Sequence, residues 1–97
     1  MTYSLHGGAA ADVAAAAGFY RREGGKALAA RFISEFGRVA ELLAGNPGLG
    51  TPTEGGRRWF SLYQFPYALI YVEEDKGIHI LVVRHQNRDP GHGDERR

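Results

Sequence analysis

The sequence contains no cysteine, so disulfide bonds and thiol chemistry are both excluded. This absence is compatible with a reducing cytoplasm, where we expect the protein to reside. No run of about 18 apolar residues is present, so we expect no membrane-spanning helix. The first residues, Met1–Leu5, lack the basic region and long apolar stretch of a secretion signal.

An excess of one charge is also missing, because 12 basic residues face 11 acidic ones and the net charge is +1. A protein that holds nucleic acid by phosphate neutralisation alone usually has a larger basic excess. Lysine is scarce, so most of the basic residues are arginine, which suits bidentate recognition of carboxylate or phosphate. The abundant alanine and glycine favour a simpler interpretation of the arginines, a GC-rich genome.

The chain has 97 residues, which is enough for one domain and too few for two. Its hydrophobic content of 43% is ordinary for a globular protein. Beyond Pro90 the residues are polar or glycine. We therefore expect a single domain over residues 1–90 and a frayed polar tail over residues 91–97.

Two stretches, residues 9–22 and residues 26–44, have the apolar spacing of amphipathic helices. The link between them, Gly24–Gly25, is so short that the helices must fold back as an antiparallel hairpin. The apolar stripes of the two helices are Val13, Ala16, Ala17 and Tyr20, and then Leu28, Phe32, Phe36, Val39 and Leu43.

Charged residues on these helices allow further predictions. Asp12 lies in the first turns of its helix, where a negative charge suits the helix dipole. On the second helix, Arg31–Glu35 and Arg38–Glu41 have the spacing of weak ion pairs.

Strand patterns precede and follow the helices. Tyr3–Leu5 predicts a short first strand that ends at Gly7–Gly8, and residues 49–56 predict a loop. Three further strands are predicted over residues 57–63, 67–74 and 78–83, and their short turns make them an antiparallel meander. The expected fold is α+β with the order β-α-α-β-β-β, a helical hairpin packed on a small, mainly antiparallel sheet.

The last predicted strand is apolar on both faces, which is typical of a central strand. Alternation places Ile78, Ile80 and Val82 on one face and Leu81 and Val83 on the other.

The densest polar cluster, residues 84–92, follows this last strand directly. Arg58, Arg84 and Arg88 could converge on an anion, and His85 and His92 are candidate acid–base groups. A metal-free ribonuclease needs such cations and proton carriers. Solvated residues at a strand end are the more common explanation.

An aromatic run begins at Trp59 and includes Phe60 and Tyr63. It predicts either a stacking platform for bases or a contact surface for a protein. Alternate burial in the sheet explains part of the run, and we assign Phe60 to the core. The candidate target-binding residues are Arg58, Trp59, Tyr63, Arg84, His85 and Arg88.

No pattern predicts a metal or a cofactor. His85 and His92 lack cysteine neighbours and helical spacing, so we expect no metal site. The glycine-rich stretch Gly45–Gly50 lacks the Lys-Ser/Thr ending of a phosphate-binding loop.

Taken together, these pieces resemble the RelE/ParE superfamily of toxins from type II toxin–antitoxin systems, and within it the ParE-like, plasmid-stabilisation branch. The order of the predicted elements is also that of this superfamily. The matching residues are Ala9, Asp12, Ala16 and Phe19-Tyr20, then Leu28–Phe32 and Glu35, Leu43 and Pro47-Gly48, Arg57-Arg58 and Leu62, Phe65-Pro66-Tyr67 and Ile70-Tyr71, Ile78, Ile80 and Val83, and His85 with Arg88-Asp89-Pro90.

The resemblance implies a toxin that arrests growth and is neutralised by direct binding of a cognate antitoxin, in a heterodimer or heterotetramer. ParE-like members inhibit DNA gyrase without enzymatic activity of their own. RelE-like members are ribosome-dependent endoribonucleases that cut mRNA. In that second case the matching catalytic positions are Arg58, Arg84, Arg88 and His92.

Three features favour gyrase over the ribosome and its mRNA as the target. The lysine-rich sheet face of the RelE-like nucleases is missing, and Gly91-His92-Gly93 replaces an aromatic pair of many relatives. The near-neutral charge also suits a protein target better than ribosomal RNA, which is a dense polyanion.

Overall fold

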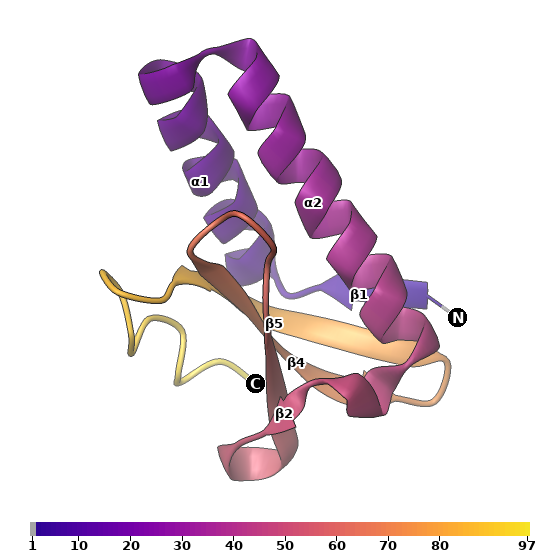
Figure 1. The fold of residues 1–97 in the computed structure, drawn as a ribbon. Coiled ribbons are helices and arrows are strands. Elements are labelled where there is room, and N and C mark those ends of the chain that lie inside the picture. Colours follow the sequence, from indigo (N-terminus) through magenta and orange to yellow (C-terminus); the bar gives the residue numbers. More distant parts are fainter. Residues whose placement is uncertain (1) are drawn as a thin grey trace.

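The computed structural model describes residues 2–97, so that Met1, the first residue of the predicted domain, lies outside them. Two antiparallel helices cover one face of a five-stranded sheet (Figure 1), which confirms the expected two-layer α+β fold. The elements are β1 (Thr2–Leu5), α1 (Gly7–Gly24), α2 (Lys26–Gly45), the 3-10 turn η1 (Pro47–Leu49), β2 (Thr51–Pro52), the 3-10 turn η2 (Glu54–Gly56), β3 (Arg57–Ser61), β4 (Tyr67–Glu74) and β5 (Gly77–His85).

The strand order across the sheet is β1-β5-β4-β3-β2. The last three strands form the predicted antiparallel meander, and β1 adds to β5 in parallel. β5 is an interior strand, in keeping with its two apolar faces. The stretch that we predicted as a loop contains the short edge strand β2, in which Pro52 opposite Arg58 is tolerated because it lies at an edge.

Helix α1 starts earlier than predicted. The Nδ1 atom of His6 accepts a hydrogen bond from the backbone N–H of Gly8 at 2.9 Å and so caps the helix. Gly7 and Gly8, which we expected to end the first strand, therefore form the first turn of the helix. None of the helices formed by residues 2–97 is long and apolar enough to span a membrane.

The predicted ion pairs on α2 are wrong. Glu35 pairs with Arg38 at 2.8 Å, in place of the expected Arg31–Glu35 and Arg38–Glu41 pairs. The reason is that Glu35 also accepts the backbone N–H of Tyr63 at 2.6 Å, which turns its carboxylate toward the β3–β4 loop.

The main core lies between the helices and the sheet. The predicted stripe of α2 supplies Phe32, Val39 and Leu43, which are fully buried, and the predicted face of α1 packs against them. Four aromatic rings meet at one end of this core, with Phe32 5.3 Å from both Phe65 and Tyr67 and 5.4 Å from Tyr20, measured between ring centroids.

A second, smaller apolar cluster of Ile70, Leu81 and Val82 lies on the sheet face without helices. The predicted alternation along β5 is wrong there, because the β4–β5 register shifts between Ile70 and Tyr71. This irregularity inserts one residue, so that Leu81 and Val82 both join the open-face cluster and Val83 joins the main core.

Candidate target-binding site

The open face of the sheet carries a groove with a volume of about 550 Å³. Its floor is formed by Trp59 of β3 and Ile70 of β4, with Arg84 of β5 beside them. One wall is the turn around Thr53 and Glu54, and the other is the C-terminal tail, residues 91–97. We call this feature the open-face groove.

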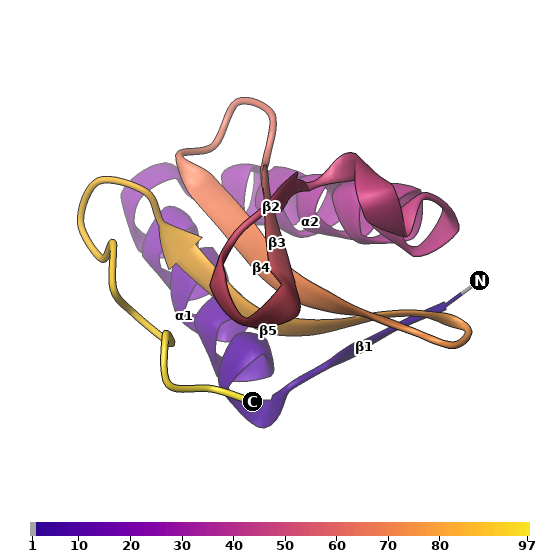
Figure 2. The ribbon, with the colours of Figure 1, turned by 90° about the horizontal axis from the view of Figure 1, so that it is seen from below.

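The tail lies along the open face beside β5 (Figure 2) and ends near the start of α1. Arg57 donates hydrogen bonds to the backbone oxygens of Asp94, at 2.8 Å, and of Arg96. Arg84 pairs with the carboxylate of Asp94 at 2.5 Å. The segment that we expected to fray therefore makes specific contacts, and the domain boundary at residue 90 stays a prediction.

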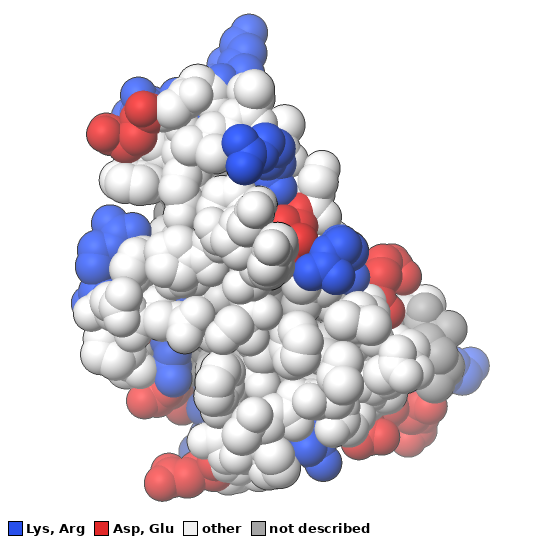
Figure 3. Space-filling model, viewed as in Figure 1, with Lys and Arg blue, Asp and Glu red and all other residues white. Residues whose placement is uncertain are grey.

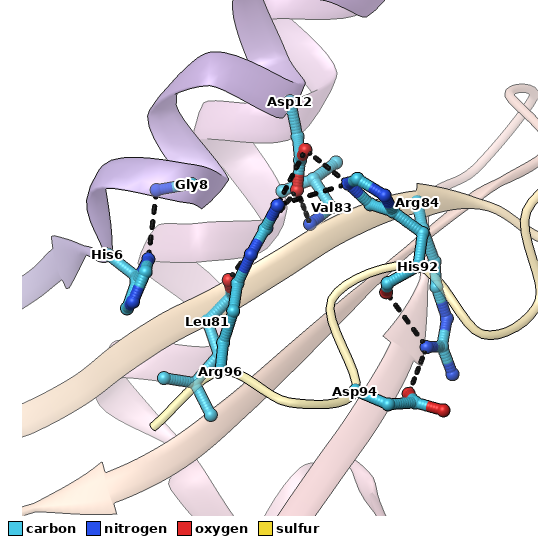
Figure 4. A network of polar contacts seen from close by, with 9 residues as sticks. All are labelled: His6, Gly8, Asp12, Leu81, Val83, Arg84, His92, Asp94 and Arg96. Carbon is cyan, nitrogen blue, oxygen red and sulfur yellow. Dashed lines mark hydrogen bonds and ion pairs between the residues drawn. The ribbon is translucent and has the colours of Figure 1, made fainter.

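Asp12 is the hub that connects the tail to the fold (Figure 4). Its carboxylate accepts the backbone N–H of Val83 at 3.0 Å, pairs with Arg96 at 2.6 Å and contacts Nε2 of His92 at 2.7 Å. The side chain is only 8% exposed. Asp12 thus joins α1, β5 and the tail, which corrects the expectation that it serves the helix dipole.

The environment of Asp12 lowers its pKa. Burial by itself raises the pKa, because it disfavours the charged carboxylate. Hydrogen bonds from Arg96, Val83 and His92 together outweigh that effect. The carboxylate is therefore charged at neutral pH and can pair with the guanidinium of Arg96.

The three arginines that we expected to converge on an anion do not meet. Arg84 lies on the open face, where it holds Asp94. Arg58 donates to the backbone oxygen of Gly50 at 2.8 Å, at the β2 end of the sheet. Arg88 lies over the ring of Phe19, with its Cζ atom 4.9 Å from the centroid.

The two candidate acid–base histidines are also separated. Nδ1 of His85 accepts the backbone N–H groups of Asn87 and Arg88, each at 3.1 Å. Burial and the positive charge of Arg88 lower the pKa of His85, which favours the neutral ring. His92 contacts Asp12 on the tail side of the sheet, so that the two histidines do not share a site.

The three aromatic residues singled out in the sequence also lie in different places. Phe60 packs against the main core, as predicted. Trp59 is 38% exposed in the open-face groove, and Tyr63 is 69% exposed on the β3–β4 loop beside α2. The groove thus unites Trp59 and Arg84, while the other four candidates lie outside it.

Asp12 and Arg96 were missed as site residues by sequence reasoning. The contacts that make them important link residues 84 positions apart. Two glycines are a signal in retrospect, because a methyl group on Gly8 would collide with the guanidinium of Arg96 and one on Gly93 would collide with Val82. Within residues 2–97, no three His, Cys, Asp or Glu side chains are grouped to hold a metal ion.

Comparison with known proteins gives three findings. A family model described as "ParE toxin of type II toxin-antitoxin system, parDE" matches residues 3–90. No curated protein matches the chain. A solved structure described as the chromosomal ParDE TA system from P. aeruginosa is similar, with a TM-score of 0.76 and 26% sequence identity over 88% of this chain and 95% of that one.

Proposed function

The chain belongs to the ParE toxin family of type II toxin–antitoxin systems, and we propose that it arrests bacterial growth by binding and inhibiting DNA gyrase. We further propose that it acts in the cytoplasm and catalyses no reaction itself. The dispersal of the candidate ribonuclease residues carries this proposal. Arg84 contacts His92 through the backbone oxygen of His92, but Arg58 and Arg88 engage other partners on other parts of the sheet, so the four candidate residues do not surround one phosphate site.

The open-face groove supports a protein target. Trp59 lies on β3 and exposes part of a large apolar ring beside Arg84. Tryptophan and arginine are the residues that most often dominate binding energy at protein interfaces. The groove is lined by acidic residues, Glu54 and Asp94, as well as by the basic residues Arg57, Arg84 and Arg97, and such a mixed lining suits a protein surface better than a polyanion.

We propose that a cognate antitoxin neutralises the toxin by direct binding, in a heterodimer or heterotetramer. Charged side chains follow α2 on the face seen in Figure 3, and the surface beside and below them is largely uncharged. Ile33 of α2 and Leu49 of the turn that follows it are 44% and 50% exposed. Exposed apolar side chains on a helix are suited to a docked partner helix.

The test is a gyrase supercoiling assay with the purified wild-type protein and the Trp59→Ala variant. We expect inhibition by micromolar wild-type protein. The variant should need at least about 10-fold more protein for the same inhibition, because removal of a central aromatic anchor costs about 2 kcal/mol or more. Tyr63→Ala is the matched control, since its exposed ring lies outside the groove.

Three outcomes would contradict the proposal in different ways. No inhibition by micromolar wild-type protein rules out gyrase. Equal inhibition by wild type and Trp59→Ala removes the groove from the interface. New mRNA ends at codon spacing after induced expression, detected by primer extension, would favour the ribosome-dependent endoribonuclease instead.

A further inference from the structure

The side chain of Arg96 lies in a narrow slot that we call the arginine socket, formed by Gly8, the carboxylate of Asp12 and the backbone oxygen of Leu81. The guanidinium pairs with Asp12 at 2.6 Å and donates to the oxygen of Leu81 at 3.2 Å. It lies so close to α1 that a side chain on Gly8 would displace the guanidinium from the socket. Only 14% of the Arg96 side chain is exposed, so the surrounding residues enclose most of it.

The socket stands at a sheet edge that lacks a neighbouring strand. β1 pairs with β5 only as far as Ile80, where the chain turns into α1. Beyond that residue, and within residues 2–97, side chains instead of a strand satisfy this edge of β5. Asp12 accepts the N–H of Val83 and Arg96 donates to the oxygen of Leu81, so that the ion pair occupies the place of an adjacent peptide group.

The tail is anchored by charge rather than by apolar packing. Residues 91–97 contain no apolar side chain, and only Gly93 among them is buried. Its side-chain anchors are the pairs of Arg96 and His92 with Asp12 and of Asp94 with Arg84. Segments with few buried apolar contacts open at low free-energy cost, so the tail is the most readily detached part of this face.

Detachment of the tail would leave the carboxylate of Asp12 without a cation, so that only certain groups could replace Arg96 in the socket. The charge of Asp12 is compensated by Arg96, and His92 also contacts the carboxylate; both residues belong to the tail. A nearly buried carboxylate without a cation is unfavourable, so a replacement must bring positive charge. It must also donate to Asp12 and Leu81 together, which suits the planar fork of a guanidinium better than an ammonium group.

We propose that the arginine socket is a binding site for an arginine of a partner protein, and that Arg96 of the tail occupies it in the free toxin. The partner would present the arginine side chain to the edge of β5 without adding a strand there, because Asp12 and the bound guanidinium already satisfy the N–H of Val83 and the oxygen of Leu81. This site lies apart from the Trp59 groove floor, and the proposal stands whether or not the target is gyrase.

The test uses the full-length Arg96→Ala variant, in which the socket is vacated, and a peptide with the sequence of residues 91–97 as the probe. Titration is followed by the backbone amide signals of Gly8, Asp12 and Val83 in two-dimensional NMR. We expect saturable shifts at these amides. The same peptide with alanine in place of the arginine at position 96 should bind at least 10-fold more weakly.

Two control proteins make the result specific. The Arg97→Ala variant retains Arg96 in the socket, so the peptide should produce little shift at the same concentration. The Asp12→Asn/Arg96→Ala variant keeps an acceptor for Val83 but lacks the charge, so binding should fall by at least 10-fold. Arg96→Lys should bind the peptide with intermediate affinity and serves if Arg96→Ala does not fold.

Absence of saturable shifts at the three amides in both Arg96→Ala and Arg96→Lys would overturn the proposal. Equal binding by the two peptides, or by proteins with and without the Asp12 charge, would also overturn it. Gyrase inhibition does not enter this test, so its outcome is independent of that of the supercoiling assay.

Discussion

The two faces of the sheet are closed by different means. The helix-covered face is sealed by large apolar side chains such as Phe32, Leu43 and Tyr71, which are fully buried. The opposite face has a small apolar cluster of Ile70, Leu81 and Val82, and the polar tail lies over part of it. The difference lies in what covers each face, two helices in one case and a segment held by ion pairs in the other.

This difference separates stability from recognition. Apolar burial between the helices and the sheet supplies most of the folding free energy, because it scales with the area removed from water. The open face contributes less, and it can therefore retain a partly exposed Trp59 and a detachable cover. Binding surfaces are generally found on such less stable parts of a protein.

Two leucines on neighbouring strands, Leu69 and Leu81, point to opposite faces of the sheet and allow the two faces to be compared directly. Leu69 and Leu81 are 0% and 1% exposed. We expect Leu69→Ala to reduce the free energy of unfolding by about 4 kcal/mol and Leu81→Ala by about 2 kcal/mol, the upper and lower parts of the usual range. The tail can shift to fill or hydrate the smaller cavity, whereas the helices cannot. Urea unfolding followed by circular dichroism measures both values, and equal losses would mean that the two faces are equally rigid.

Most of the fold could be predicted from the sequence because the dominant signals are local. The helical stripe from Leu28 to Leu43 and the two-glycine link define the hairpin without reference to distant residues. The alternation in β5 could not be predicted past Ile80, because the irregular register depends on its pairing with β4. The edge strand β2 was missed since two residues with a proline carry almost no strand signal.

Less of the candidate site could be predicted. A contact role was predicted for whichever of Trp59 and Tyr63 faces outward; both are exposed, and Trp59 lies in the groove. The convergence of Arg58, Arg84 and Arg88 failed because Arg58 and Arg84 lie at different positions along β4 and on different faces of the sheet, while Arg88 lies beyond the end of β5. Asp12 was predicted to interact with the dipole of its own helix, because no sequence pattern near Asp12 indicates its contact with Arg96.

Asp12 holds the tail on the open face through its contacts with Arg96 and His92. The lowered pKa of Asp12 means that its charge stabilises the folded state above the unfolded pKa of about 4, and that this stabilisation is lost as pH falls through the folded value. At pH 7 we expect Asp12→Asn to cost about 1–2 kcal/mol, since it keeps a neutral hydrogen-bond acceptor and Arg96 can swing into solvent. The gap between wild type and variant should close below about pH 4.

Thermal or urea unfolding of both proteins from pH 5 to pH 2 measures this gap. The single tryptophan, Trp59, reports on the groove in the same samples, and its quenching by acrylamide should increase in the variant because the tail forms a wall beside it. A gap that widens on acidification would give the pKa shift the opposite sign. Unchanged quenching would show that Asp12 does not hold the tail.

A second carboxylate, Glu35, tests whether the effect of Asp12 on the tail comes from its chemistry alone or also from its position in the fold. Glu35 resembles Asp12 in that it accepts one backbone N–H, from Tyr63, and pairs with one arginine, Arg38. The arginine of Glu35 comes from its own helix, whereas Arg96 comes from the far end of the chain. The hydrogen bond from Arg38 and that from Tyr63 lower the pKa of Glu35 despite partial burial.

Glu35→Gln should therefore have the smallest effect of the three changes. The amide still accepts the N–H of Tyr63, and an exposed pair within one helix contributes only about 0.5 kcal/mol. We expect a loss of that size in urea unfolding, with Trp59 quenching unchanged because the β3–β4 loop lies outside the groove. Glu41→Gln is the matched control, since Glu41 is exposed on the same helix. If Glu35→Gln increased the accessibility of Trp59 as much as Asp12→Asn, control of the groove would not be specific to the residue that holds the tail.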